Sequence, residues 1–127
     1  MDWVSHAVNA FGHSVGLENL SLDDDGCALF ELEPGGKLWL HDLDAAGGDE
    51  VLVVLASPLP APAGTSARQA LRLADFRVNP SWQTQLSVRG PDLVVTLRMP
   101  RHSFMLSALE EAVESLFSFH ERVAQGS

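Results

Sequence analysis

The chain contains a single cysteine, Cys27, so no disulfide can form within it. One thiol suits a reducing compartment, although a bridge between two copies of the chain stays open. Long apolar runs are also missing, since no stretch approaches the roughly 20 residues that span a membrane. The start, MDWVSHAVNAFGHS, has neither a basic leader nor an extended apolar segment, so we expect no secretory signal there.

Basic residues are scarce. The chain has 8 lysines and arginines against 17 aspartates and glutamates, a formal net charge of −9 with the histidines neutral. Such a chain repels nucleic-acid phosphates and anionic lipid, so we predict no nucleic-acid partner and no membrane insertion, whereas a basic partner would be attracted. Plain solubility is the alternative explanation of the acidity. The hydrophobic content of 46% is typical of a globular protein and not of a disordered acidic tail.

The length of 127 residues predicts one domain, residues 1–127, that can fold without disulfides or metal. A first helix is predicted over residues 3–15, where apolar side chains recur at spacings of four, three and four and form one stripe. Asp2 can cap its start, and Gly16 is placed to end it. The stripe consists of Val4, Val8, Phe11 and Val15.

Three strands are predicted next. Residues 27–32 alternate in side-chain character, the Pro-Gly turn that follows them is chemically suited to a reversal, and residues 37–42 form the returning strand. Residues 50–56 (EVLVVLA) are apolar on both faces and rich in β-branched side chains, so we expect them to be the most buried strand. The proline-rich residues 57–64 can be neither helix nor inner strand and are predicted to be an extended connector.

The second half of the chain predicts a short helix that begins at Thr65 or Ser66 and closes before Asn79-Pro80. Residues 82–89 and 93–98 then form a hairpin, and residues 103–125 form the longest helix. Its predicted stripe consists of Leu106, Leu109, Val113, Leu116, His120 and Val123. The order helix, three strands, helix, two strands, helix predicts an α+β fold with a twisted antiparallel sheet.

The run Asp23-Asp24-Asp25-Gly26 invites a calcium-loop interpretation, which fails on register. With Gly26 at position 6 of an EF-hand loop, position 12 is Leu32, where a bidentate carboxylate is required. Aspartate bonds its own backbone in turns and glycine relaxes the turn, so the run is interpreted as a turn that leads into the first strand.

No residue set predicts catalysis, a metal or a cofactor. His6 and His13 are seven apart, not at the spacing of four that zinc pairs use on a helix. Cys27 has no nearby CxxC partner and is interpreted as an inert thiol. His102 and Ser103 are adjacent and rarely could face each other, and Ser103 is explained as the cap of the last helix.

Glu110, Glu111 and Glu114 are interpreted as a solvated acidic helix face, not as an acid/base pair.

Apolar side chains exceed what one small core needs. Trp39 lies on the strand face opposite to Leu38 and Leu40, and Phe30 and Leu32 add to the excess. Large exposed apolar patches usually mark partner or self-association sites. The alternative is that Trp39 and Trp82 cap the edges of the core. The further apolar side chains of this excess are Leu73, Phe76, Trp82, Phe104, Phe117 and Phe119.

The order of elements and several phrases resemble the class I chaperones of bacterial type III secretion, small acidic proteins that hold effectors for export. "GLENLSLDDDGCALFEL" resembles the family's entry, acidic turn and first strand, and "KLWLHDL" and "DEVLVVLASPLP" resemble the next two strands. "ARQALRLADFRVNPSWQTQLSV" and "VVTLRMPRHSFMLSALEEAVESLFSFHERV" resemble the rest, so nearly the whole chain is covered. One departure is Ala74-Asp75, where an asparagine often precedes the phenylalanine that matches Phe76.

The resemblance implies a non-enzymatic homodimer of the bacterial cytoplasm, without a cofactor, that binds an N-terminal segment of a cognate secreted effector. Two alternatives stay open: a regulator of secretion with the same fold, and a small enzyme that uses Cys27 or His102. A subunit of a larger machine is a further alternative. The residues that the resemblance assigns to effector binding are Val4, Leu17, Leu20, Leu22, Phe30, Leu32, Leu38 and Leu40. Those that it assigns to the dimer interface are Leu71, Leu73, Phe76, Trp82, Leu86 and Val88.

Overall fold

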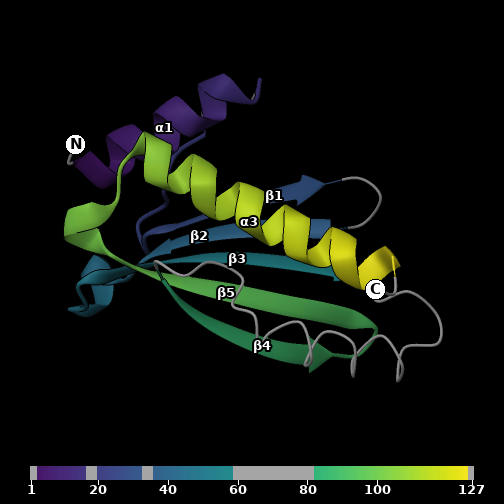
Figure 1. Ribbon diagram of the computed structural model, residues 1–127. Coiled ribbons are helices and arrows are strands. Elements are labelled where there is room, and N and C mark those ends of the chain that lie inside the picture. Colours follow the sequence, from purple (N-terminus) through teal and green to yellow (C-terminus); the bar gives the residue numbers. More distant parts are fainter. Residues whose placement is uncertain (1–2, 17–19, 33–35, 59–81, 126–127) are drawn as a thin grey trace.

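The computed structural model describes residues 3–16, 20–32, 36–58 and 82–125 (Figure 1). The described residues form two helices, five strands and two short 3-10 helices, η1 and η2. The bounds are α1 Trp3–Ser14, β1 Cys27–Leu32, β2 Gly36–Asp42, η1 Leu43–Ala46, β3 Glu50–Pro58, β4 Gln83–Arg89, β5 Asp92–Pro100, η2 Arg101–Ser103 and α3 Leu106–Gln125.

The five strands form one antiparallel sheet in the order β1-β2-β3-β5-β4. The predicted α+β class and the five predicted strands are confirmed, with β3 and β5 longer than the sequence indicated. The short helix predicted after Thr65 lies outside the described residues, as does the connector beyond Pro58. None of the described helices is long and apolar enough to cross a membrane.

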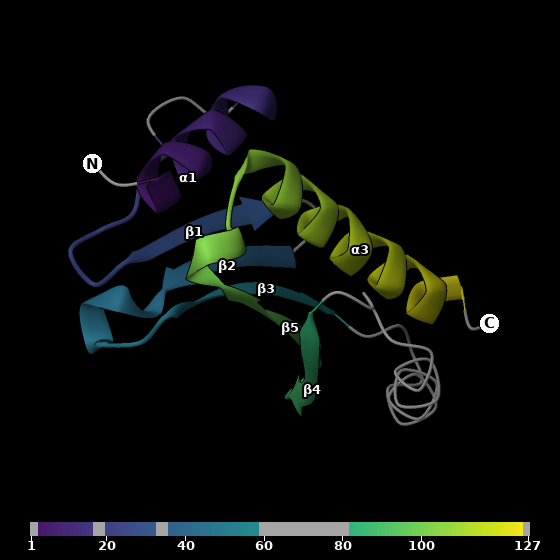
Figure 2. The ribbon, with the colours of Figure 1, turned by 60° about the vertical axis from the view of Figure 1, so that its left-hand side comes forward.

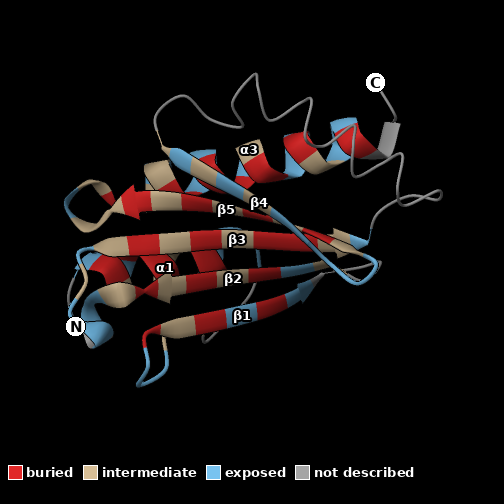
Figure 3. Ribbon diagram, turned by 90° about the horizontal axis from the view of Figure 1, so that it is seen from below, coloured by how far each residue is buried: buried red, intermediate tan, exposed pale blue. Residues whose placement is uncertain are grey.

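Both helices lie on the same face of the sheet (Figure 2). Successive side chains of a strand point to opposite faces, so one set lies beneath the helices and the other on the far face of the sheet. Buried and half-buried residues therefore alternate along the inner strands (Figure 3). The buried set from the strands includes Ala28, Phe30, Leu38, Leu40, Val51, Val53, Leu55, Leu93, Val95, Leu97 and Met99.

The central strand β3 was expected to be the most buried strand because it is apolar on both faces, and only one of those faces is buried. Val51, Val53 and Leu55 are buried beneath the helices, whereas Leu52 and Val54 on the other face are half-buried. The reason is that the described helices cover a single face of the sheet, so an apolar strand in its centre still meets solvent on the other side.

Three expectations about the helices need correction. Phe104 and Phe119 were placed partly off the core stripe, yet both are buried, and Phe117 remains exposed. Val15 was placed on the stripe of the first helix but is 51% exposed, because α1 ends at Ser14 and the chain turns there. The last helix begins at Leu106, so its expected cap, Ser103, lies in the preceding η2 turn.

The aspartate run forms the predicted turn. The Asp23 carboxylate Oδ1 accepts the backbone N–H groups of Asp25 and Cys27, each at 2.9 Å. Gly26 has φ 81°, a conformation that favours glycine, and a Cβ built there would collide with the carbonyl oxygen of Asp42. The run is therefore a structural element that brings the start of β1 against the end of β2.

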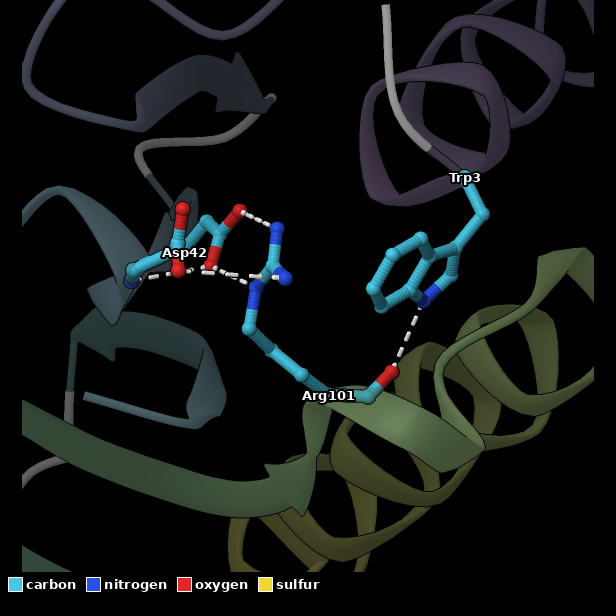
Figure 4. A network of polar contacts seen from close by, with 4 residues as sticks. Trp3, Asp42 and Arg101 are labelled. Atoms are coloured by element: carbon cyan, nitrogen blue, oxygen red, sulfur yellow. Dashed lines mark hydrogen bonds and ion pairs between the residues drawn. The ribbon is translucent and has the colours of Figure 1, made fainter. Parts of the chain in front are cut away.

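A polar network connects the start of α1 to the ends of the strands β2 and β5 (Figure 4). The Arg101 guanidinium donates from Nε to Asp42 Oδ1 at 2.7 Å and from Nη2 to Oδ2 at 2.8 Å, and both side chains are almost buried. The Arg101 Cζ atom lies 4.7 Å from the centre of the Trp3 ring, whose Nε1–H donates to the Arg101 carbonyl at 2.9 Å. One arginine thus joins α1, β2 and β5.

Replacing one partner of this pair should destabilise the fold. Asp42→Asn leaves a nearly buried guanidinium without its counter-charge and should lower the free energy of unfolding by about 3 kcal/mol. Arg101→Lys cannot donate two parallel bonds and should cost about 1–2 kcal/mol. Urea denaturation measures both values.

The matched control is Arg98→Lys, which alters a more exposed ion pair with Glu50. It should change the urea midpoint much less than Arg101→Lys. Equal losses at the two arginines would show that the buried pair has no special role.

His120 makes stability depend on pH. Its Nε2 lies 3.0 Å from the carbonyl oxygen of Leu55, to which the neutral imidazole donates, and burial lowers the pKa of His120 below its ordinary value of 6.5 despite that bond. The unfolded chain therefore takes up this proton more readily, so the contribution of His120 is complete above about pH 6.5 and is lost as the pH falls. We expect His120→Gln, which keeps a donor, to reduce the loss of stability between about pH 7.5 and pH 5.5.

The measurement is the urea midpoint of both proteins at both pH values, since the other titrating groups cancel in the difference. Parallel pH dependences of wild type and variant would contradict the assignment.

Candidate partner-binding surfaces

A groove of about 600 Å³ lies between α1 and α3, over β1 and β2. The two helices diverge above the sheet (Figure 1), and the groove is lined by residues from both sides of this opening. The described residues that line the groove are Phe11, Val15, Phe30, Glu31, Leu38, Glu110, Val113, Glu114, Phe117, Ser118 and Glu121.

The floor of the groove is apolar. The rings of Phe11 and Phe30 stack with their centres 6.1 Å apart, so α1 and β1 contribute one aromatic surface. Leu38 from β2 and Val113 from α3 continue it, and all four side chains are largely buried. These residues belong to the core, and the groove exposes only the upper edge of that core.

The rim differs from the floor. Val15 at the end of α1 is 51% exposed, and Phe117 on α3 is 45% exposed, so two apolar side chains stand at the two walls. Glu110 and Glu114 on α3 are exposed beside them. An apolar floor with apolar and acidic walls is suited to binding another protein segment.

A second hollow, of about 490 Å³, lies on the opposite face of the sheet. Three of its residues are in register across three strands, since Trp39 pairs with Val54 and Val54 with Thr96. On the edge strand, Leu29 pairs with Trp39 and is 51% exposed. The described lining consists of Trp39, Val54, Gln85, Leu86, Ser87, Arg89, Val94 and Thr96.

The residues assigned to effector binding do not share one surface. Val4 and Leu40 are completely buried in the core, so they support the fold and no partner can contact them in this conformation. Phe30 and Leu38 lie at the floor of the groove. Leu20 and Leu22 are half-buried against the core, Leu17 lies outside the described residues, and Leu32 ends β1 with a side chain that is not described.

The residues assigned to the dimer interface divide in the same way. Leu71, Leu73 and Phe76 lie outside the described residues. Trp82 and Leu86 are half-buried and pack against the core. Val88 on the edge strand β4 is 49% exposed.

The groove includes residues that the sequence had assigned elsewhere. Val15 was predicted to lie on the apolar stripe of the first helix, and Glu110 and Glu114 were predicted to form a solvated acidic face of the last helix. Phe117 gave the one usable signal, because a phenylalanine outside the stripe of an amphipathic helix is an unexplained apolar group on the surface.

The alternative of a catalytic thiol is not favoured by its surroundings. Burial, together with the carboxylates of Asp23 and Asp25, raises the pKa of the Cys27 thiol above its ordinary value. A reactive cysteine needs a lowered pKa. Among the described residues, no group of His, Cys, Asp and Glu side chains is arranged to hold a metal ion, and no buried side-chain nitrogen or oxygen lacks a hydrogen-bond partner.

Comparison with known proteins gives likeness in structure only. No protein-family model matches the chain, and no curated protein matches its sequence. The chain is similar to a subunit of the ExsC–ExsE complex, with TM-score 0.74, 15% identity and coverage of 98% of this chain and 96% of that one. It is also similar to a chain of the complex between the Yersinia pestis type III secretion chaperone SycH and a fragment of YscM2 (TM-score 0.69, 12% identity, coverage 98% and 99%).

A third similar structure is the HopA1–SchA chaperone–effector complex, with TM-score 0.67, 15% identity and coverage of 94% and 91%. The chain has a type III secretion chaperone-like fold. At these identities the likeness establishes the architecture of the chaperone fold over nearly the whole chain, and it confirms the family resemblance at that level.

Phe117 should be an accessible apolar group that contributes little to the stability of this chaperone-like fold. Phe117→Ser should reduce the fluorescence of the apolar dye ANS bound to the folded protein, because it removes one apolar wall of the groove. Unfolding free energy should change by less than about 0.5 kcal/mol, as for surface substitutions generally.

The matched control is Met105→Ser, which removes another exposed apolar side chain that does not line the groove. Equal dye signals from the two variants would mean that the groove does not take up the dye.

Proposed function

We propose that the protein is a type III secretion chaperone that binds the N-terminal chaperone-binding segment of a cognate effector and keeps it soluble and competent for secretion. The observation that carries this proposal is the likeness of nearly the entire chain to structures described as chaperone complexes with bound proteins. The groove, and the hollow on the sheet face opposite the described helices, give such a partner apolar side chains to contact. In this proposal the protein acts by binding and not as an enzyme.

The proposal includes a homodimer in the cytoplasm of a bacterium. Support for the dimer comes from the edge position of β4, whose exposed Val88 and half-buried Leu86 lie among the residues assigned to the interface. An unpaired strand edge carries free backbone donors and acceptors that a second copy can pair.

A regulator of secretion with the same fold is the second candidate. It is favoured by two of the comparison structures, in which the bound proteins are ExsE and a fragment of YscM2 and are not described as effectors. Both roles use the same kind of binding surface, so the identity of the partner distinguishes them.

The test is capture of the tagged full chain with its partners from the cytosol of the organism that encodes it. We expect one dominant partner, held through a protease-resistant N-terminal segment, on a chaperone dimer of about 27 kDa, twice the 13.7 kDa chain. Mass spectrometry identifies the partner, and light scattering gives the mass after the partner is removed.

A secretion regulator as the dominant partner would favour the second candidate. A chain that remains monomeric and captures no partner would contradict the proposal altogether.

A further inference from the structure

One carbonyl group joins the start of α1 to the segment that leads into α3. The carbonyl oxygen of Arg101 accepts the indole N–H of Trp3 at 2.9 Å (Figure 4) and the backbone N–H of Phe104 at 3.1 Å. Trp3 is the first residue of α1, and Phe104 is buried in the core just before α3 begins at Leu106. A carbonyl oxygen has two lone pairs, so this one atom can hold both segments at the same time.

Arg101 is itself fixed to the sheet. Its backbone N–H donates to the carbonyl of Asp49, the residue before β3, at 2.8 Å, and its guanidinium makes the two bonds to Asp42 at the end of β2. The Trp3 ring lies over that guanidinium, with Cζ 4.7 Å from the ring centre. The start of α1 is therefore attached to a rigid point, although the Trp3 side chain is half exposed.

The rest of α1 is held in a different way. Val8 and Phe11 are buried, and the Phe11 ring stacks on Phe30 with the ring centres 6.1 Å apart. Apolar contact is non-directional, and packed helices vary by about 15–20° in crossing angle for one kind of contact. A polar bond in the middle of α1, from Asn9 Nδ2 to the Leu20 carbonyl at 3.2 Å, leads to the connection before β1 and not to α3. The direction of α1 relative to α3 therefore depends on how its start is held.

The length of α1 amplifies a small rotation at its start. Its 12 residues extend over about 18 Å from Trp3 to Ser14. A rotation of about 10° about Trp3 would move the opposite end by about 3 Å. Val15, at that end, forms one wall of the groove and Phe117 on α3 forms the other, whereas Trp3 does not line the groove. A change at Trp3 would thus alter the width of a groove that it does not touch.

We propose that the contact between Trp3 and Arg101 is the pivot that sets the angle between α1 and α3, so that Trp3 is a positioning residue for the groove. The angle is a property of the chain alone. Its importance for partner binding rests on the proposed function.

The experiment measures the distance between the two helices in the full chain by pulsed electron spin resonance. Spin labels are attached through His13→Cys and Arg122→Cys, at exposed positions in the last turns of α1 and α3 that do not line the groove. Cys27→Ser prevents a third label. An excess of unlabelled chain removes distances between two copies of the protein.

Two variants weaken the pivot by different amounts. Trp3→Leu removes both the ring over the guanidinium and the N–H donor, whereas Trp3→Phe keeps a ring and removes only the donor. We expect Trp3→Leu to shift or broaden the distance distribution by about 3 Å, and Trp3→Phe to change it less. The matched control is Leu29→Ala, which removes an apolar side chain of the same 51% exposure from the other face of the sheet and should change nothing.

An unchanged distribution in Trp3→Leu would overturn the proposal, and so would an equal change in Leu29→Ala. Circular dichroism shows whether each variant is folded. If Trp3→Leu does not fold, Trp3→Phe decides the question alone, and an unchanged distribution in that variant overturns the proposal.

The groove itself should respond to the same substitution. ANS fluorescence of Trp3→Leu should rise by about twofold as the apolar walls separate, and Phe117→Ser introduced into the same chain should abolish that rise. A rise that persists after Phe117→Ser would place the newly exposed apolar surface outside the groove, and it would overturn the positioning role of Trp3.

The two proposals fail separately. A chain that captures a partner from cytosol, but whose helix distances do not depend on Trp3, keeps the chaperone function and loses the pivot. A chain whose distances change as expected, but which captures no partner, keeps the pivot and loses the function.

Discussion

The ion pair between Asp42 and Arg101 determines how the helix layer sits on the sheet. Asp42 ends β2, Arg101 follows β5, and the central strand β3 lies between those two strands. Through its ring contact and its carbonyl, the same arginine holds Trp3, the first residue of α1. The start of α1 and the approach to α3 are therefore fixed at one corner of the molecule, and the helices diverge from that corner. The groove follows from this arrangement, because the two helices that form its walls separate with increasing distance from that corner.

The groove combines two physical requirements that usually oppose each other. A binding surface needs exposed apolar groups, and these favour aggregation. Here the apolar side chains of the groove floor, such as Phe30 and Leu38, are core residues that the fold requires in any case. Among the described apolar residues that line the groove, only Val15 and Phe117 are exposed large side chains. The exposed glutamates beside them, Glu110 and Glu114, keep this rim hydrated.

Much of the sheet could be predicted from the sequence because its signals are local. Alternating side chains and turn formers such as the run before Gly26 place each strand within two residues of its observed ends. The burial of α3 was harder, since Phe119 and His120 both lie one turn beyond Leu116 and the period alone does not choose between them. Phe104 was missed because it precedes the helix and reaches the core from a 3-10 turn. The groove itself depends on the angle between α1 and α3, which no local pattern encodes.

The strand order has a consequence for the reach of a bound chain. In the order β1-β2-β3-β5-β4, the strand beside the groove and the strand assigned to dimer contacts are the two opposite edges of the sheet, about 19 Å apart at the usual strand spacing. Two copies joined along β4 would therefore carry their grooves at the outer ends, separated by about 40 Å. One partner chain that occupies both would have to bridge that distance with at least about 12 extended residues. A partner chain could then occupy both grooves only if the two segments that bind them are separated in its sequence by a linker of at least that length.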